Sequence, residues 1–269
     1  AFHFRGNPGR IDLDPSWQQA AWRFVVMGFE HILGGLDHLL FLLCLVAPFR
    51  RIGALVAIVT AFTVAHSITL AAASLGAVPD RLWFPPLVET LIAVSILYMA
   101  LENVVLGASG PFGRSAVRRR WILAFGFGLI HGFGFSFALS ESLQFAGAHL
   151  VTSLAAFNVG VELGQLLVLA GLVPVLALLF RGVVTERVGV LVISVVVAHS
   201  AWHWMTSRGE TLSTYSWTTD DARLIASVVR VLLVMVSAAA AIWLVHDLWR
   251  RRRAVAGPRD LPEGPAPRT

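Results

Sequence analysis

The segment Phe24–Ala47, FVVMGFEHILGGLDHLLFLLCLVA, decides how the chain folds. Its two ends are as apolar as a membrane-spanning helix, for which about 20 such residues suffice. Its centre carries the polar stretch His31–His38, HILGGLDH, in which two histidines and an aspartate flank a pair of glycines. Ionisable groups are costly in hydrocarbon and usually functional where they occur. The segment therefore predicts a membrane span that contains a polar site.

The rest of the chain repeats the apolar pattern. Of the 269 residues, 57% are hydrophobic and 14% are charged, whereas a soluble domain has about 25% charged residues. The apolar runs are continuous rather than alternating, which favours helices over a barrel. We therefore predict an all-α, multi-pass helical bundle with about seven transmembrane helices. The predicted spans lie near Phe24–Ala47, Ile52–Leu75, Pro86–Leu106, Trp121–Glu141, Val151–Phe180, Val188–Thr206 and Ala222–Trp249.

The arginines predict an orientation. All 21 basic residues are arginines, and most fall in alternate loops and in the tail: Arg50, Arg51, Arg114, Arg118, Arg119, Arg120, Arg181, Arg187 and Arg250 to Arg253. Because basic loops stay in the cytoplasm, we expect the N-terminus outside and the C-terminus inside, in a bacterial inner membrane. Residues 1–23 then form a periplasmic segment with an interfacial helix, residues 24–249 the bundle, and residues 250–269 a basic, disordered cytoplasmic tail.

Composition also excludes several classes of protein. The chain has no lysine, so it cannot form a retinal Schiff base. Its single cysteine, Cys44, excludes a disulfide framework and a thiolate-rich metal site. Since the topology explains the net charge of +5, no nucleic-acid partner is implied. The expected partners are the lipid bilayer and a metal ion, and a homo-oligomer or a metallochaperone partner stays open.

A weak internal repeat links the two halves of the predicted bundle. Gly28–His31 (GFEH) resembles Gly128–His131 (GLIH), and Ala61–Ala65 (AFTVA) resembles Ala156–Gly160 (AFNVG). Three spans separate the copies, so the copies run in opposite directions. This arrangement is that of a 3+3 inverted repeat, which in many transporters encloses the substrate site. The alternative is chance similarity between apolar sequences.

The spacing of the buried polar residues suggests shared helix faces. His31 and His38 lie at i and i+7, and Gly34–Gly35 between them either admits a neighbouring helix closely or breaks the span. Two further pairs at i and i+4 are Asn158 with Glu162 and His199 with His203. By depth, Asp37, His38, His131, Glu162 and His199 fall near the membrane centre, and His31, His66 and His203 toward the outer face.

These residues favour a transition-metal site. Imidazole and carboxylate suit divalent nickel, cobalt, zinc or copper better than calcium or magnesium. Only neutral imidazole binds a metal, so binding should weaken as pH falls through the histidine range. The predicted ligands are His31, Asp37, His38, His66, His131, Glu162, His199 and His203, with Glu30, Asn158 and Gln165 in support. We interpret Glu89 and Glu102, near span ends, as structural, either solvated or paired with Arg230.

At this point the sequence resembles a known family. The stretch GFEHILGGLDHLLFLL is similar to the first-span signature of the HupE/UreJ family, in which a histidine is followed after five residues by Asp-His. His31, Asp37 and His38 match that pattern. The segments AFTVAHSITLAAASLG, GLIHGFGFSFAL and FNVGVELGQLLVL resemble the family's later blocks, and the likeness covers residues 24–206. These blocks place His66, His131, Asn158, Glu162 and Gln165 at motif positions.

The resemblance implies a nickel or cobalt permease associated with hydrogenase and urease maturation. One difference is that characterised permeases carry a glutamate shortly after the His-Gly of the fourth span. Ala138 stands there in this chain, and Glu141 follows one turn later, as in the family's second branch.

Three functions follow from the sequence. The first is a permease for a divalent transition metal, nickel or cobalt before zinc or copper, which is not an enzyme. Because the chain has no G-x-x-x-x-G-K-[ST] motif, such transport would be passive, ion-coupled or dependent on a partner. The second is an intramembrane zinc hydrolase in which His199 and His203 contribute to a catalytic zinc site. The third is a b-type haem protein in electron transfer, with histidines as axial ligands.

Overall fold

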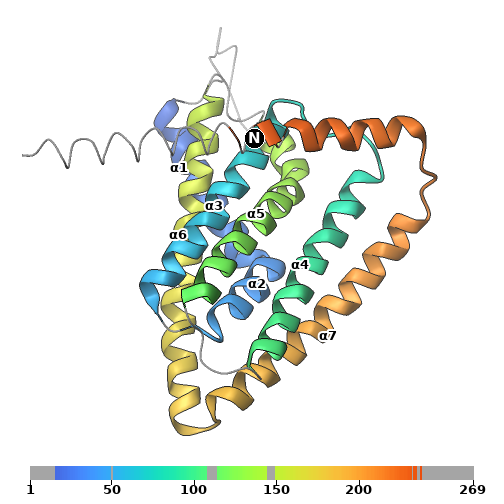
Figure 1. Ribbon diagram of the computed structural model, residues 1–269. Coiled ribbons are helices and arrows are strands. Elements are labelled where there is room, and N and C mark those ends of the chain that lie inside the picture. The colour runs from blue at the N-terminus through green and yellow to red at the C-terminus, as the bar shows by residue number, and fades with distance from the viewer. Residues whose placement is uncertain are drawn as a thin grey trace, which may run out of the picture.

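The fold is a bundle of helices. A computed structural model describes residues 16–49, 51–107, 114–143, 149–231, 233, 234 and 237, and these contain no strand. The helices are α1 (Trp17–Gly34), α2 (Leu36–Val46), α3 (Ile52–Ser74), α4 (Phe84–Gly107), α5 (Arg114–Leu143), α6 (Leu150–Gly182) and α7 (Glu186–Ser213), and a further helix begins at residue 219. Figure 1 shows their arrangement. The all-α prediction is confirmed.

Four of the helices and one bent pair have the length and apolarity of membrane spans. Helices α3, α4, α6 and α7 could each cross a bilayer, and the bent pair α1–α2 raises the number to five if it forms one span. The predicted fourth span coincides with α5. The helix that begins at residue 219 starts the predicted seventh span, but most of that span, like the predicted tail 250–269, lies outside the described residues. The orientation in the membrane stays a prediction.

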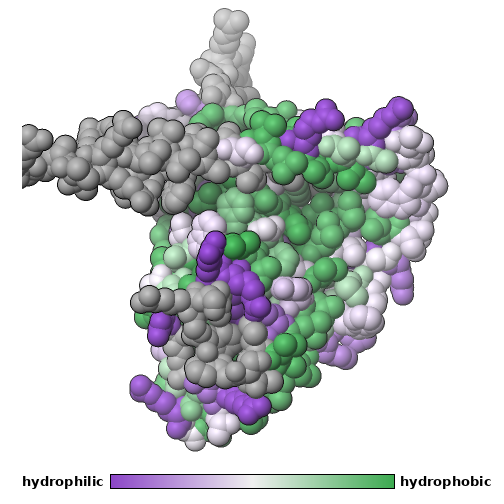
Figure 2. Space-filling view, viewed as in Figure 1, coloured by the Kyte–Doolittle hydropathy of each residue, from purple (hydrophilic) through white to green (hydrophobic). Residues whose placement is uncertain are grey.

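The outward faces of the helices suit a lipid environment. Helix α4 turns a stripe of apolar side chains outward, which recur at helical spacing and are 38–50% exposed: Leu91, Val94, Tyr98 and Leu101. Figure 2 shows apolar residues over much of one face of the molecule, with hydrophilic residues at its upper and lower ends and in one patch between them. Exposed apolar stripes of this kind are expected where lipid replaces water.

The N-terminal segment differs in one respect from the sequence prediction. Ser16 caps α1 by accepting a hydrogen bond from the Gln19 backbone, and the Gln19 side chain reaches back to the Ser16 N–H. Trp17 and Trp22 therefore lie in the first turns of α1, which continues without a break into the first span. Within the described residues no separate interfacial helix precedes α1, and the rest of the predicted segment 1–23 lies outside them.

The helix pairs follow the symmetry of the predicted repeat. Helix α1 packs mainly against α6, α3 against α5, and α4 against α7. If the first half (α1–α4) is exchanged with the second (α5–α7), the α1–α6 pair maps onto the α5–α3 pair and the α4–α7 pair maps onto itself. Figure 1 shows α4 and α7 running side by side in opposite directions, as an inverted repeat requires.

The residues of the repeated sequences form equivalent helix contacts in the two halves. The Cα of Gly28 lies so close to α6 that an added Cβ would strike the Phe157 carbonyl, and at Gly128 an added Cβ would lie 2.5 Å from the Phe62 carbonyl. Phe62 and Phe157 occupy equivalent positions in AFTVA and AFNVG. The same glycine therefore meets the same phenylalanine in both halves, which supports the repeat over chance similarity.

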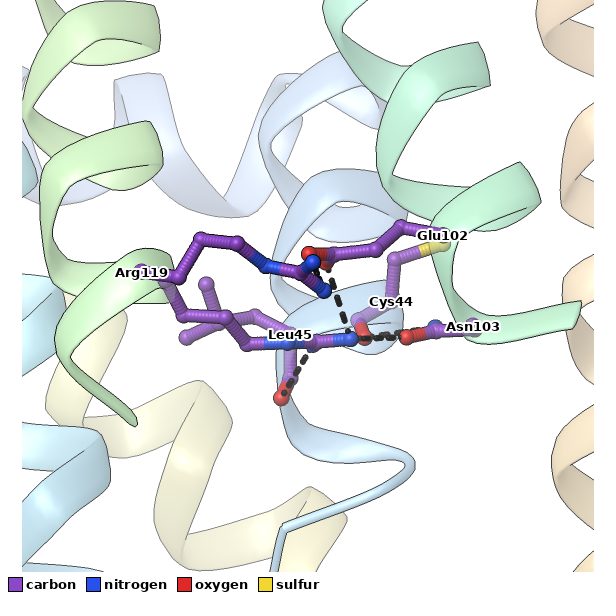
Figure 3. Close-up of polar contacts among 6 residues, drawn as sticks. Cys44, Leu45, Glu102, Asn103 and Arg119 are labelled. Atoms are coloured by element: carbon purple, nitrogen blue, oxygen red, sulfur yellow. Dashed lines mark hydrogen bonds and ion pairs between the residues drawn. The ribbon is translucent and has the colours of Figure 1, made fainter. Parts of the chain in front are cut away.

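A buried arginine fixes the far end of α2. The Arg120 side chain is fully buried and donates to the Cys44 carbonyl at 3.2 Å. Arg120 also pairs with Glu102 at 3.1 Å and contacts Asn103, whose Nδ2 donates to the same Cys44 carbonyl at 2.8 Å. Figure 3 shows that this network joins α2, α4 and α5, and that Arg119 approaches Glu102 from α5. The last carbonyls of a helix have no partner within the helix, so this arginine completes α2.

The structure corrects the position predicted for Arg120 and removes one of the two alternatives left open for Glu89 and Glu102. The charge rule places Arg120 in a cytoplasmic loop, but this side chain lies inside the bundle, where Glu102 and the α2 carbonyls bind it. Glu102 and Glu89 do not pair with Arg230: Glu102 pairs with Arg119 and Arg120, and Glu89 pairs with Arg208 on α7.

The close contact at Gly128 gives a test of the packing. Gly128→Ala should lower the free energy of unfolding by about 1–3 kcal/mol, because the added methyl must push α5 away from α3. Gly126→Ala in the same helix is the control, since nothing lies within 4 Å of its added Cβ. Thermal unfolding of both variants in detergent measures the difference. Equal midpoints would contradict the close packing of α3 and α5.

Candidate metal centre

A break in the first span brings its polar residues together. Helix α1 ends at Gly34 and α2 begins at Leu36, and the two axes differ by 69°. Gly35 between them is extended, with φ −84° and ψ 100°. A Cβ at Gly35 would lie 2.8 Å from both the His31 carbonyl and His38 Nδ1. The glycine pair was predicted either to admit a neighbouring helix or to break the span, and the structure shows the break. The break requires glycine at position 35, because any side chain there would collide with His31 and His38.

Four imidazoles meet at this break. His31 comes from α1, His38 from α2, His66 from α3 and His131 from α5. The ring centroids of His31 and His38 are 4.6 Å apart, those of His38 and His131 5.3 Å, and those of His31 and His66 5.9 Å. Gly132 allows this approach, since a Cβ there would lie 2.5 Å from the His66 carbonyl.

The donor atoms form two overlapping groups. In the first, one ligand atom from each of His31, His38 and His66 lies within 4.8 Å of the others. In the second, Asp37, His38 and His131 meet the same limit. We call these the outer triad and the inner triad. His38 belongs to both, so the two positions cannot each use the same His38 nitrogen at once.

Hydrogen bonds set which nitrogen of His131 and of His38 is available to a metal ion. Ser95 Oγ donates its single proton to the Ile92 carbonyl at 2.7 Å, so it accepts from His131 Nε2 at 2.9 Å. His131 Nδ1 then keeps its lone pair and has no hydrogen-bond partner among the described residues. In the same way, His38 Nδ1 bonds Asp37 at 3.1 Å, and its Nε2 has no hydrogen-bond partner in the described part of the chain. Such carboxylate and hydroxyl partners orient histidine ligands in metal sites.

The surroundings of the cluster are largely dry. His66 is fully buried, His131 is 1% exposed and His38 is 3% exposed. Phenylalanines from three helices line the cluster: Phe62 lies 5.2 Å from the His131 ring, and Phe135 lies 4.2 Å from the His31 ring and stacks on Phe157. Apolar walls limit the access of water, which strengthens the attraction between a cation and its ligands.

The structure places three predicted α6 residues beside the cluster but in neither triad. Glu162 accepts a hydrogen bond from Thr60 at 2.6 Å, and Gln165 accepts one from Thr63 at 2.8 Å. The Asn158 side chain donates to the Leu154 carbonyl of its own helix at 2.8 Å. Glu162 and Gln165 therefore tie α6 to α3 in this structure.

The remaining predicted residues lie apart from both triads. His199 and His203 contact each other on α7, with ring centroids 4.6 Å apart, and both are exposed. Glu30 is exposed on α1 and lines a separate pocket with Trp22 and Arg23. Spacing correctly paired the two α7 histidines, but it could not tell which way their shared face points. Ala138 and Glu141 have side chains outside the described part of α5.

Comparison with known proteins identifies the family of this chain. Residues 9–208 match the family model described as HupE / UreJ protein. The chain belongs to the HupE / UreJ family. The match contains both triads and all of α1 to α6, so the resemblance carried by the sequence blocks is confirmed. No curated protein and no solved structure matches the chain.

Sequence reasoning missed Ser95, the residue that orients His131. Ser95 is fully buried on α4, and an isolated serine in an apolar span gives little signal by itself. Only the packing of α4 beside α5 reveals its role in this HupE / UreJ protein. In the sequence, the only indication for Ser95 is its position near the middle of its span, at the same depth as His131 on the next span.

Gly35 gives a direct test of the site. Gly35→Ala should weaken binding of Ni²⁺ or Co²⁺ at least tenfold, because a methyl at this position displaces His38 and Asp37. Gly34→Ala is the matched control, as nothing lies within 4 Å of its added Cβ. Isothermal titration calorimetry on both purified variants measures the change. If both bind like the unmodified chain, the cluster is not the metal centre.

Ser95 gives a second test, of ligand orientation. Ser95→Ala removes the acceptor for His131 Nε2–H, so the ring can rotate or change tautomer, and metal affinity should fall by about 10–100-fold. Ser136→Ala is the control, because its hydroxyl donates to the Phe133 carbonyl within α5. Both variants should keep the unfolding midpoint of the unmodified chain. An unchanged affinity for Ser95→Ala would remove Ser95 from the site.

Proposed function

We propose that this protein is a permease for a divalent transition-metal ion, nickel or cobalt, in the bacterial inner membrane. The observation that carries the proposal is the pair of triads that share His38 inside the bundle. Membership of the HupE / UreJ family, which is associated with nickel and cobalt transport, supports it.

The donor set supports this class of metal. The triads offer three imidazoles, or two imidazoles and one carboxylate. Nitrogen-rich sites favour nickel, cobalt, zinc and copper(II), whereas magnesium and calcium take oxygen ligands. The one cysteine, Cys44, is buried near the Arg120 network and belongs to neither triad, so no thiolate draws the site toward copper(I).

The overlap of the triads favours transport over fixed binding. A structural metal site closes around one position with its full set of ligands. Here an ion held by His31, His38 and His66 can pass to Asp37 and His131 while His38 stays attached. Each transfer replaces some ligands without returning the ion to water, which keeps the barrier between the two positions low.

The zinc-hydrolase alternative loses one of its sequence features. The pair His199 and His203, which it counted as contributing to a zinc site, is exposed and lies in neither triad. The HupE / UreJ family is of the transporter type, which agrees with a protein that is not an enzyme. The visible spectrum in the experiment below distinguishes the haem alternative from a permease.

His38 is the residue to test, because both triads require it. His38→Ala should abolish metal binding to protein purified without a histidine tag, and should abolish metal accumulation in cells. His199→Ala, outside both triads, is the control and should bind metal normally. Plasma mass spectrometry gives the metal content, and the visible spectrum of the same sample tests for a Soret band. Normal accumulation with His38→Ala, or a Soret band, would overturn the proposal.

A further inference from the structure

An open cavity adjoins the inner triad. It has a volume of about 360 Å³ and lies between the break in the first span, α4 and α7. Its lining includes Gly35, Asp37, Glu89, Trp204 and Arg208. Glu89 lies in the first half of α4 and Arg208 near the end of α7, so the cavity opens toward the side that the arginine distribution assigns to the outside.

Asp37 is the point at which the cavity meets the cluster. Its side chain is 29% exposed, whereas the side chain of His38 beside it is 3% exposed. The Asp37 carboxylate therefore faces the cavity while one of its oxygens bonds His38 Nδ1. A cation in the cavity can reach Asp37 before it reaches any imidazole of the inner triad.

An ion pair stands at the exposed part of this cavity. Glu89 Oε2 and Arg208 Nε are 3.1 Å apart, and the two side chains are 46% and 54% exposed. Ion pairs exposed to this degree are weak, because water and salt screen them. Such a pair can open when a stronger competitor arrives, and a divalent cation attracts a carboxylate more strongly than a guanidinium does.

We propose that this cavity is the entry vestibule for divalent cations and that Glu89 is its capture ligand. The inference rests on the permease function proposed above. Arg208 occupies Glu89 when no cation is present and moves aside when one binds. The ion then passes from Glu89 to Asp37, the second carboxylate of the vestibule, and from there to His38. Glu89 attracts any divalent cation, so selection among metals belongs to the imidazoles.

The arrangement also explains why the vestibule contains an arginine. Two unpaired carboxylates on an apolar wall would hold a cation firmly and delay its transfer. With Arg208 present, Glu89 regains a partner as soon as the ion leaves, which favours forward movement. The apolar walls from Ile92 and Ala93 concentrate the remaining negative charge of Asp37 along the path.

Initial uptake of ⁶³Ni²⁺ or ⁵⁷Co²⁺ tests the capture role. Glu89→Gln should lower the initial rate at limiting metal about tenfold and reduce its dependence on salt, whereas Arg208→Gln should raise the rate at low metal. Neither should change how much metal the buried cluster holds at saturation. Glu210→Gln is the control, an exposed carboxylate close to Arg208 that does not line the cavity.

The outcomes separate this inference from the permease function. If Glu89→Gln takes up metal at the unmodified rate while His38→Ala binds none, the vestibule is wrong and the permease stands. If Glu89→Gln and Arg208→Gln lower the rate equally, the ion pair is structural and the capture role is wrong. If His38→Ala still takes up metal normally, the permease function itself fails.

Cysteine labelling gives a second readout that does not depend on uptake. The native Cys44 is buried, so it gives little background. Leu36→Cys places a thiol in the vestibule, and a charged, membrane-impermeant thiol reagent should label it in intact cells, more slowly with Co²⁺ present. Val64→Cys, on an outward face of α3 away from the cavity, is the control and should stay unlabelled. No labelling of Leu36→Cys in intact cells would contradict an entry from outside.

Discussion

The structure depends on the rule that a polar group inside a membrane bundle must find a partner within the bundle. An imidazole has two nitrogens, and in the neutral ring one donates and the other accepts. Where Ser95 or Asp37 takes the donor nitrogen of His131 or His38, the accepting nitrogen turns into the cluster. For His38 and His131, the need to satisfy one side of the ring therefore prepares the other side for a cation, whereas neither nitrogen of His66 has a hydrogen-bond partner among the described residues.

The inverted repeat explains how such a cluster forms at the centre. His31 and His131 are the last residues of the two repeated segments, so the symmetry brings them from opposite halves to one place. They lie on either side of His38, and each belongs to one triad. The symmetry ends there, because only the first half has Gly35 and the break that follows it, whereas α5 continues through the equivalent region. The single break supplies the shared ligand that a symmetric site would lack.

The sequence predicted those features of the site that are determined by residues close together in the chain. Two adjacent glycines among polar residues indicated either a break or a close helix approach, and the repeat indicated a substrate site between the two halves. The sequence could not predict whether the polar face of a helix points toward the cluster or away from it, because that depends on how the neighbouring helices pack. Glu162 therefore turned out to bond Thr60, and His199 lies on the outer side of α7. The charge rule misplaced Arg120 for a related reason, since a charge near a span end can be buried when a carboxylate on the adjacent helix faces it.

The two triads are held by different packing partners, which bears on how an ion can move between them. The inner triad comes from α2 and α5, with Ser95 from α4, and the Arg120 network ties the same three helices together at the other end of α2. The outer triad adds His31 from α1 and His66 from α3, and α1 packs mainly against α6. A shift of α1 together with α6 would therefore separate His31 from His38 while the inner triad kept its geometry. If the cluster binds a metal ion as proposed, such a shift would change the relative affinity of the two positions, with His38 on the fixed unit as the ligand common to both.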